Sequence, residues 1–439
     1  MDATISAVHG RRIWDSRGRP TVEVDVRLAG GAKGRGVAPA GASRGSREAV
    51  DLRDGGARLG GFDVGRAVAG VNGEIAGALL GRDGADQAAI DHSLIVLDGT
   101  PDKSRLGGNA LIATSLAVLN AAAAAHGMPL WRHLAGGAPV RLPLPEIQIF
   151  GGGAHAGRRV DVQDFMVMPL GAASFGQGLE MAAEVYRAAG DLMRGQGKLY
   201  GVADEGGYWP AFASNEEALQ RLVAAIERAG LAPGEQIGIS LDIAASEFGH
   251  GGRYHLALDA RELDSAGMVA LVLGWLERYP IVSIEDPLAE DDPDGWAQLM
   301  TALGALGRPV QVIGDDLLVT QAAQVDLAAT RGLCNAVLIK PNQAGTVTET
   351  RAALDAGRRA GFATIVSARS GETEDATIAH LAVGWDAGQM KVGSFARSER
   401  MAKWNEVVRI EEALGAKALF AGRSVLGGGA KAARLKNQV

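Results

Sequence analysis

The chain has 439 residues, of which 47% are hydrophobic and 22% are charged, and its formal net charge is −7 at pH 7. This composition excludes a disordered chain and a membrane protein, and a length about three times that of a usual domain favours two domains or a large barrel with an accessory domain. Acidic and basic residues are mixed, so no basic face is available for nucleic acid. One cysteine, Cys334, excludes an internal disulfide framework and thiolate zinc clusters. No charged-then-apolar leader follows Met1, which indicates the cytoplasm.

The first part of the chain predicts a small domain of mixed structure. Apolar and polar residues alternate up to about residue 60, as in TVEVDV at 21–26, which predicts a half-buried antiparallel strand. Between residues 64 and 135 the period changes to that of buried helices, and the segment 109–125 is too rich in alanine and too interrupted by polar residues to span a bilayer. Two prolines, Pro143 and Pro145, stiffen the chain where the composition shifts. We therefore predict an N-terminal domain of residues 1–138 and a C-terminal domain of residues 139–439.

A repeated pattern follows, in which a short apolar run ends in a charged residue and leads into a helical stretch. The runs are residues 237–242, 281–285, 310–315, 336–340, 364–369 and 390–391. Strands of this kind, separated by helices, belong to a parallel α/β sheet. Six charged strand ends suggest a closed barrel with its active site on that rim. The alternative is an open doubly wound sheet, but no G-x-G-x-x-G follows a first strand and no P-loop occurs, so nucleotide binding has weak support.

Three acids end consecutive predicted strands and predict a metal site. Asp242, Glu285 and Asp315 would meet at one mouth of the barrel, where three carboxylate ligands suit Mg²⁺. A single acid at a strand end is more often a cap or a salt-bridge partner, but three in series favour the metal site.

The next charged strand ends are lysines, and they suggest a base. Lys340 and Lys391 follow apolar residues, and a lysine that faces a divalent cation and a second lysine should have a pKa lowered toward neutrality. Such a lysine can remove a proton from the carbon beside a carboxylate, and the metal then holds the ene-diolate. Glu205 lies in a glycine-flanked acidic loop and could protonate a leaving hydroxyl, although a lone acid in a loop is usually only solvated.

Two further segments suggest an anion site. Arg369 and Ser370 offer a guanidinium and a hydroxyl beside a glycine, and His155 lies in a glycine-rich loop that could close over a small substrate. Nucleophilic catalysis is poorly supported, because no G-x-S-x-G occurs and Cys334 has no histidine near it in sequence. Together these residues predict metal-assisted proton abstraction from a small anionic carboxylate.

At these residues the chain resembles the enolase (phosphopyruvate hydratase) family over nearly its whole length. The segments that carry the resemblance are DSRG at 15–18, PTVEV at 20–24, GAS at 41–43, DEGG at 204–207, IEDP at 284–287, GDDL at 314–317, KPNQ at 340–343, SGETED at 370–375 and ARSER at 396–400. The resemblance implies an N-terminal α+β capping domain, a C-terminal modified (β/α)8 TIM-type barrel, and a homodimer or higher homo-oligomer.

The resemblance also implies roles for individual residues and two Mg²⁺ ions per active site. Asp242, Glu285 and Asp315 are expected to bind the first Mg²⁺, and Ser43, in a mobile loop, to help bind the second through the substrate phosphate. Lys340 is expected to be the base at C2 and Glu205 the acid for the C3 hydroxyl. The substrate would be held by Lys391 at its carboxylate and by Arg369 with Ser370 at its phosphate. His155, from its glycine-rich loop, is a further substrate-binding candidate.

The sequence departs from the family pattern near the expected site. Asp164 replaces a glutamate and Ala368 a histidine, Arg44 stands where a small residue is usual, and Gly151 and Arg19 each replace an asparagine. A carboxylate withdrawn by about 1 Å can cost on the order of 10²-fold in a positioned step. An added arginine and a vacated histidine suggest that the ligand carries a second anionic group.

These departures leave the metal ligands, Lys340 and Glu205 in place, so we favour an active enzyme with a changed substrate. The chain resembles the carboxyphosphonoenolpyruvate synthases of phosphinothricin-type biosynthesis, which implies a CMP-activated phosphonoformate as a second substrate, with its extra carboxylate facing Arg44. The first alternative is an ordinary enolase that converts 2-phosphoglycerate to phosphoenolpyruvate. The second is an inactive pseudo-enolase that acts as a binding protein.

Overall fold

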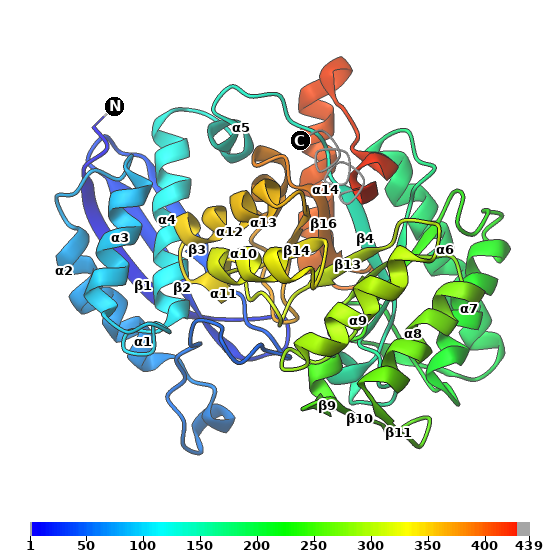
Figure 1. The fold of residues 1–439 in the computed structure, drawn as a ribbon. Helices are drawn as coiled ribbons and strands as arrows, with labels where there is room; N and C mark the ends of the chain where they lie inside the picture. Colours follow the sequence, from blue (N-terminus) through cyan, green and yellow to red (C-terminus); the bar gives the residue numbers. More distant parts are fainter. Residues whose placement is uncertain (1, 428–439) are drawn as a thin grey trace, which may run out of the picture.

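The computed structural model describes residues 2–427, and its N-terminal part is a three-stranded sheet covered by helices (Figure 1). Strands β1 (Ile5–Trp14), β2 (Pro20–Leu28) and β3 (Lys33–Val37) are antiparallel in the order β1-β2-β3. The predicted strand at 21–26 lies within β2. It is more buried than its alternation predicts, because Glu23 on its polar side pairs with Arg11.

A long buried helix packs against this sheet. The helices of this part are α1 (Gly65–Gly70), η2 (Val71–Ile75), α2 (Ala76–Leu79), α3 (Gln87–Asp98), α4 (Gly108–Ala125) and α5 (Leu130–Ala135), preceded by η1 (Arg58–Gly61). Within residues 2–427, α4 is the one helix long and apolar enough to cross a membrane, but 89% of it is buried inside the protein. It therefore has the character of a core helix, as the sequence predicts.

The C-terminal part is a closed barrel. Within the described residues its ring consists of β4 (Leu144–Gly151), β5 (Asp164–Met168), β8 (Gly238–Asp242), β12 (Ile281–Glu285), β13 (Gln311–Gly314), β14 (Ala336–Ile339), β15 (Ala363–Ser367) and β16 (Gly388–Gly393). The pairing of β16 with β4 closes the ring. Strand β5 is antiparallel to both neighbours, and the other ring pairs are parallel. The predicted barrel and capping domain are confirmed, and the open-sheet alternative is wrong.

Helices alternate with the ring strands after an irregular start. The hairpin β4–β5 is followed by α6 (Phe175–Gly195) and α7 (Asn215–Arg228) before the first parallel strand. The later helices are α8 (Ser265–Arg278), α9 (Pro293–Gly304), α10 (Ala322–Arg331), α11 (Pro341–Ala344), α12 (Val347–Arg359), α13 (Thr377–Gly384) and α14 (Ser398–Leu414). The smaller elements are η3 (Gly153–Ala156), β6 (Leu199–Val202), β7 (Tyr208–Pro210), η4 (Ala245–Glu247), β9 (Gly249–His250), β10 (Arg253–Leu256), β11 (Arg261–Asp264), η5 (Gly415–Lys417) and η6 (Gly422–Gly427).

The six strands expected from sequence are all in the ring, and the two that sequence analysis missed are β4 and β5. Strand β4 contains Pro145, Glu146 and Gln148, so it lacks the uninterrupted apolar run by which the others were recognised. Its start was interpreted as a domain boundary instead. The division between residues 138 and 139 stays a prediction.

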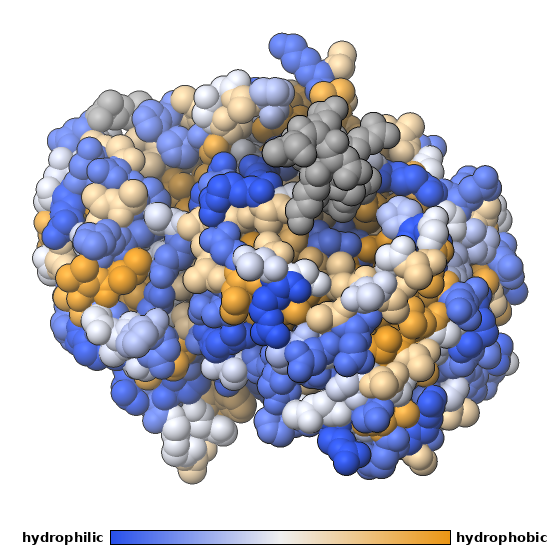
Figure 2. Space-filling model, in the orientation of Figure 1, coloured by the Kyte–Doolittle hydropathy of each residue, from blue (hydrophilic) through white to orange (hydrophobic). Residues whose placement is uncertain are grey.

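The N-terminal part reaches over one end of the barrel. The backbones of Ala40 and Gly371 exchange two hydrogen bonds of 2.9 Å, which attach the segment after β3 to the loop after β15. The outer surface is mixed, and Figure 2 shows hydrophilic residues interspersed with small hydrophobic patches on the face drawn. The segment after β3 thus brings residues of the N-terminal part to the rim formed by the carboxyl ends of the parallel strands.

Candidate active site

The three predicted acidic ligands lie together at the carboxyl ends of adjacent parallel strands. Asp242 ends β8 and Glu285 ends β12, and these two residues are register partners. Asp315 follows the last residue of the next strand, β13. All three side chains are buried. Parallel strands pointing the same way around a closed barrel bring these side chains to one mouth.

The two lysines also lie at this mouth, where they are paired with the acids. Lys391 Nζ lies 2.7 Å from Asp242 Oδ2 and 2.8 Å from Glu285 Oε2. Lys340 Nζ donates to Asp315 Oδ2. Each ammonium therefore neutralises acids that the sequence analysis proposed as metal ligands.

With protein groups alone, both lysines have raised pKa values, and the lowered pKa expected beside a bound cation stays a prediction. Burial disfavours the ammonium of Lys340, but the carboxylates of Asp315 and Glu285 together outweigh it and leave the pKa above its usual value. The same balance, with Asp242 and Glu285 as partners, raises the pKa of Lys391 well above its usual value.

A second group joins His155, Asp164 and Glu205 beside the lysines. His155 Nδ1 lies 3.2 Å from Asp164 Oδ1, and His155 Nε2 lies 4.0 Å from Glu205 Oε1. Asp164 also accepts a hydrogen bond from Gln148 Nε2. The loop of His155 forms the short helix η3, and Asp204 N donates to the His155 carbonyl at 3.1 Å, so the backbone of this loop is tied to that of Glu205.

The pKa values of the two acids in this group shift in opposite directions. Burial raises the pKa of Glu205, which favours its protonated form. Burial also acts to raise the pKa of Asp164, but the charge and hydrogen bond of His155 outweigh it and lower that pKa. His155 itself has a raised pKa, because the neighbouring acids outweigh the effect of its burial. Two carboxyl groups whose pKa values shift apart in this way suit different tasks, because one can donate a proton and the other stays charged.

The anion-binding candidates lie where the N-terminal segment meets the rim. Arg369 donates from Nη1 to Glu48 Oε2 at 2.9 Å and from Nη2 to the carbonyl of Ser43 at 2.9 Å. A Cβ added at Gly41 would lie 1.8 Å from Arg369 Nη2, so only glycine allows this approach. Ser370 Oγ accepts from Arg17 Nη1 at 3.1 Å.

Sequence analysis missed several residues of this site. Glu48 pairs with Arg369, Gln163 Nε2 donates to Asp242 Oδ2 at 3.1 Å, and Gln343 Nε2 donates to Asp315 Oδ1 at 2.8 Å. Arg17 and Gln343 lie in segments that carried the family resemblance, which was the one available signal for them. Gln163 is polar but uncharged and carried no signal of its own.

The structure does not bring Arg44 to the site. Its side chain is exposed and does not line the cavity between the acids and Arg369, although its neighbour Ser43 does. That cavity has a volume of only about 10 Å³, and Ala368 lines it. The cavity therefore offers little open space beside Ala368, and Asp242, Lys340 and Lys391 lie in its wall.

The acidic residues fit a divalent cation. Glu285 Oε1 is buried and has no hydrogen-bond partner among the described residues. Burial and the neighbouring Asp242 raise the pKa of Glu285 well above its usual value, and a bound cation would stabilise its charged form. Oxygen ligands crowded in this way suit Mg²⁺.

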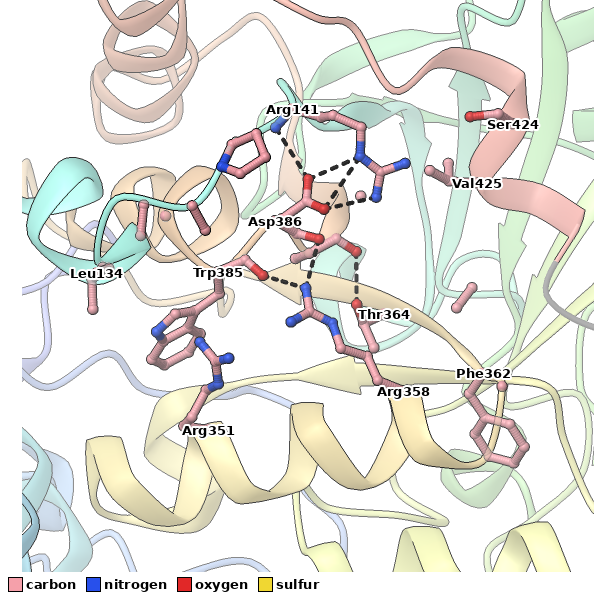
Figure 3. A pocket seen from close by; sticks show the side chains of 18 residues that line it. Leu134, Arg141, Arg351, Arg358, Phe362, Thr364, Trp385, Asp386, Ser424 and Val425 are labelled. Carbon is pink, nitrogen blue, oxygen red and sulfur yellow. Dashed lines mark hydrogen bonds and ion pairs between the residues drawn. The ribbon is translucent and has the colours of Figure 1, made fainter.

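A wide cavity lies at the other end of the barrel and carries different chemistry (Figure 3). It has a volume of about 760 Å³ and is lined by the first residues of β15 and β16. Arg141 pairs with Asp386 at 2.9 Å and Arg351 pairs with Asp355 at 2.9 Å. Its arginines are thus occupied by acids of the protein, and the predicted site residues lie at the opposite end of the strands.

Comparisons with known proteins cover both parts of the chain. Residues 5–134 match the family model described as "Enolase, N-terminal domain", and residues 139–427 match the one described as "Enolase, C-terminal TIM barrel domain". The chain is 49% identical over 424 residues to a protein named "Enolase 1" from Desulfitobacterium hafniense (strain Y51), and the alignment covers 96% of each chain.

Proposed function

Because the chain belongs to the enolase family, we propose that it is an ordinary enolase, a lyase that removes water from 2-phosphoglycerate to give phosphoenolpyruvate. Enzymes of this family act on a small phospho-acid and use Mg²⁺. The observation that carries the proposal is the meeting of Asp242, Glu285 and Asp315 with Lys340 and Lys391 at one barrel mouth. The 49% identity to a protein named as an enolase, over nearly the full length of both chains, supports it.

In the proposed reaction the lysines have separate tasks. Asp242, Glu285 and Asp315 would hold one Mg²⁺, and Ser43 would help hold a second through the substrate phosphate. The metal supplies positive charge that stabilises the negative charge developing on the substrate carboxylate. Lys340 would accept the proton from C2. Its ion pair with Asp315 has to be broken first, because that carboxylate raises the pKa of Lys340.

The leaving hydroxyl would be protonated by the second group of side chains, His155, Asp164 and Glu205. Burial favours the protonated form of Glu205, which suits it to donate a proton to the C3 hydroxyl. Asp164, held by His155 and Gln148, would fix the position of this group. Lys391 would bind the substrate carboxylate, and His155, Arg369 and Ser370 the phosphate.

The interpretation as a carboxyphosphonoenolpyruvate synthase has less support. It depended on Arg44 and on space beside Ala368, and Arg44 is exposed away from a cavity of about 10 Å³. The family relationship favours the ordinary reaction. The CMP-activated phosphonoformate substrate and the homodimer or higher oligomer remain predictions.

The direct test is to add 2-phosphoglycerate to the purified protein with Mg²⁺ and to follow phosphoenolpyruvate by its ultraviolet absorbance. We expect turnover with Mg²⁺ and none with EDTA. Turnover that appears only after a cytidylyl-phosphonoformate is added would restore the synthase interpretation. Absence of activity under both conditions would favour a pseudo-enolase.

A further inference from the structure

A layer of polar side chains lies inside the barrel just below the proposed active site. Ser240, Ser283 and Gln389 each stand two positions before a charged site residue on the same strand, and alternate residues of a strand face the same side. Gln311 Nε2 donates to Ser283 Oγ at 2.9 Å and to Gln389 Oε1 at 3.0 Å. Barrel interiors are usually filled by branched apolar side chains, so this layer is unusual.

Glu146 places a carboxyl in this layer. It lies on β4 and has no exposed surface. Ser240 Oγ donates to its Oε2 at 2.8 Å, whereas Oε1 has no hydrogen-bond partner among residues 2–427. A buried hydrogen-bond acceptor without a partner is unfavourable. We therefore expect the carboxyl group in this position to interact with a positive charge nearby.

The nearby positive charge is Lys391. Glu146 and Lys391 are register partners on β4 and β16, the pair of strands that closes the barrel. Burial raises the pKa of Glu146 to about 7, the Ser240 hydrogen bond and the Lys391 charge lower it, and the Asp242 charge raises it. Glu146 therefore interacts electrostatically with both the ammonium and one of the proposed metal ligands.

Lys391 needs such a partner when a cation binds. Its ammonium now pairs with Asp242 Oδ2 and Glu285 Oε2, on the carboxylates proposed to hold Mg²⁺. If Mg²⁺ takes both carboxylates, their negative charge is shared with the cation and no longer fully balances the ammonium. The acids that remain near it are Asp164, whose Oδ2 is 3.6 Å from Nζ, Glu205, whose charge also acts on the ammonium, and Glu146 on the neighbouring strand.

We propose that Glu146 is a positioning residue whose carboxylate is the countercharge that lets the Lys391 ammonium release Asp242 and Glu285 to Mg²⁺. This inference rests on the proposed function for the identity of the metal site. Glu146 does not touch the substrate and acts through Lys391. Without its charge, Lys391 stays on the two acids and competes with the cation.

The test is the Mg²⁺ dissociation constant, measured by calorimetry without substrate. Glu146→Gln keeps the shape of the side chain and removes its charge, and should raise the dissociation constant about tenfold or more. Glu146→Asp should recover most of the affinity because it keeps the charge. Ser283→Ala, in the same layer but not bonded to Glu146, is the matched control and should leave the dissociation constant within about twofold of the wild-type value.

Folding defects are separated from the charge effect by a second uncharged variant. Glu146→Met fills the space without an unpaired polar atom and should weaken Mg²⁺ binding as Glu146→Gln does, with an unchanged circular dichroism spectrum. Wild-type affinity in either folded variant would overturn the proposal.

A double-mutant cycle tests the route through Lys391. In a Lys391→Met background the effect of Glu146→Gln on the dissociation constant should largely disappear. If the full effect persists, Glu146 acts on the cation directly and the positioning role is wrong. Because Mg²⁺ binding needs no turnover, these results are independent of whether the wild-type protein dehydrates 2-phosphoglycerate.

Discussion

At the scale of single residues, the site is a set of charges that hold one another in place. Lys340 pairs with Asp315, Lys391 with Asp242 and Glu285, and both lysines have raised pKa values as a result. Both ammonium groups are therefore held by carboxylates of the protein before any ligand arrives. Binding of a cation and a substrate has to exchange these internal pairs for external ones.

Lys340→Ala should lower kcat by about 10²- to 10⁴-fold, the usual contribution of a positioned general base. The fold should be kept, because the variant removes one member of a pair at the rim and leaves the barrel core intact. The measurement is steady-state kinetics with 2-phosphoglycerate and Mg²⁺. Lys417→Ala, at an exposed position, is the control. Activity unchanged by Lys340→Ala would remove this lysine from the proposed mechanism.

Asp164→Asn should lower the pKa of His155. In the wild type this pKa is raised, with Asp164 the neighbouring acid that contributes most against the effect of burial, so His155 keeps its proton to higher pH than free imidazole. Any anion binding that depends on the charged ring is present at low pH and is lost as the pH rises through the raised pKa. In the variant this loss should occur at lower pH.

The measurement is the titration of the His155 ring signals by nuclear magnetic resonance. Asp191→Asn, which removes an acid on α6 that pairs with Arg194, is the control and should leave His155 unchanged. A His155 titration that is the same in wild type and Asp164→Asn would contradict the assigned charge coupling.

At the scale of elements, close backbone approach explains part of the high content of glycine and alanine. Helix α4 lies directly on β3, and a Cβ added at Gly34 would lie 2.1 Å from both the Ala117 carbonyl oxygen and the Ala121 amide nitrogen. Backbone atoms of a buried helix cannot move aside singly. The glycines of β3 and the alanines of α4 are therefore both needed for the close packing of the strand on the helix.

Gly34→Ala should destabilise the protein by about 1–3 kcal/mol or more through overpacking. The measurement is unfolding in urea followed by circular dichroism. Gly73→Ala is the matched control: a Cβ there meets no atom within 4 Å, and in a helical segment alanine should be neutral or stabilising by up to about 1 kcal/mol. Equal stability of the two variants would mean that β3 can move away from α4.

At the scale of the whole molecule, the site is assembled from distant parts of the chain. Glu48 and Ser43 of the N-terminal part hold Arg369 of the barrel, and Arg17 reaches Ser370. These contacts join the turn between β1 and β2 and the segment after β3 to the loop after β15. The two parts are thus coupled at the rim.

Mg²⁺ should stabilise the whole protein. A ligand that binds only the folded state stabilises it by about 2.7 kcal/mol at a concentration 100 times its dissociation constant, so the melting temperature should rise with Mg²⁺ and return to its initial value with EDTA. Differential scanning calorimetry measures this shift. Asp242→Asn removes one proposed ligand charge and should reduce the shift. A melting temperature that does not depend on Mg²⁺ would contradict the metal site.

Much of the fold could be predicted from local patterns, and the exceptions have a physical cause. Six ring strands show apolar runs because they are buried on both faces, and the run at Ile281–Glu285 is typical. Strand β4 was missed because Glu146 and Gln148 face inward and interrupt its apolar pattern. One of these polar residues, Glu146, supplies the further inference about Lys391.

The sequence alone determined which chemical groups are present and roughly where each strand ends, because the hydrophobic period and a charged residue at its end are local properties. The tertiary structure decided which groups meet. Closure of β16 onto β4 placed Lys391 beside Glu146, and the segment after β3 brought Glu48 to Arg369 while leaving Arg44 in solvent. Pairings between residues hundreds of positions apart depend on packing and register, which no local pattern records.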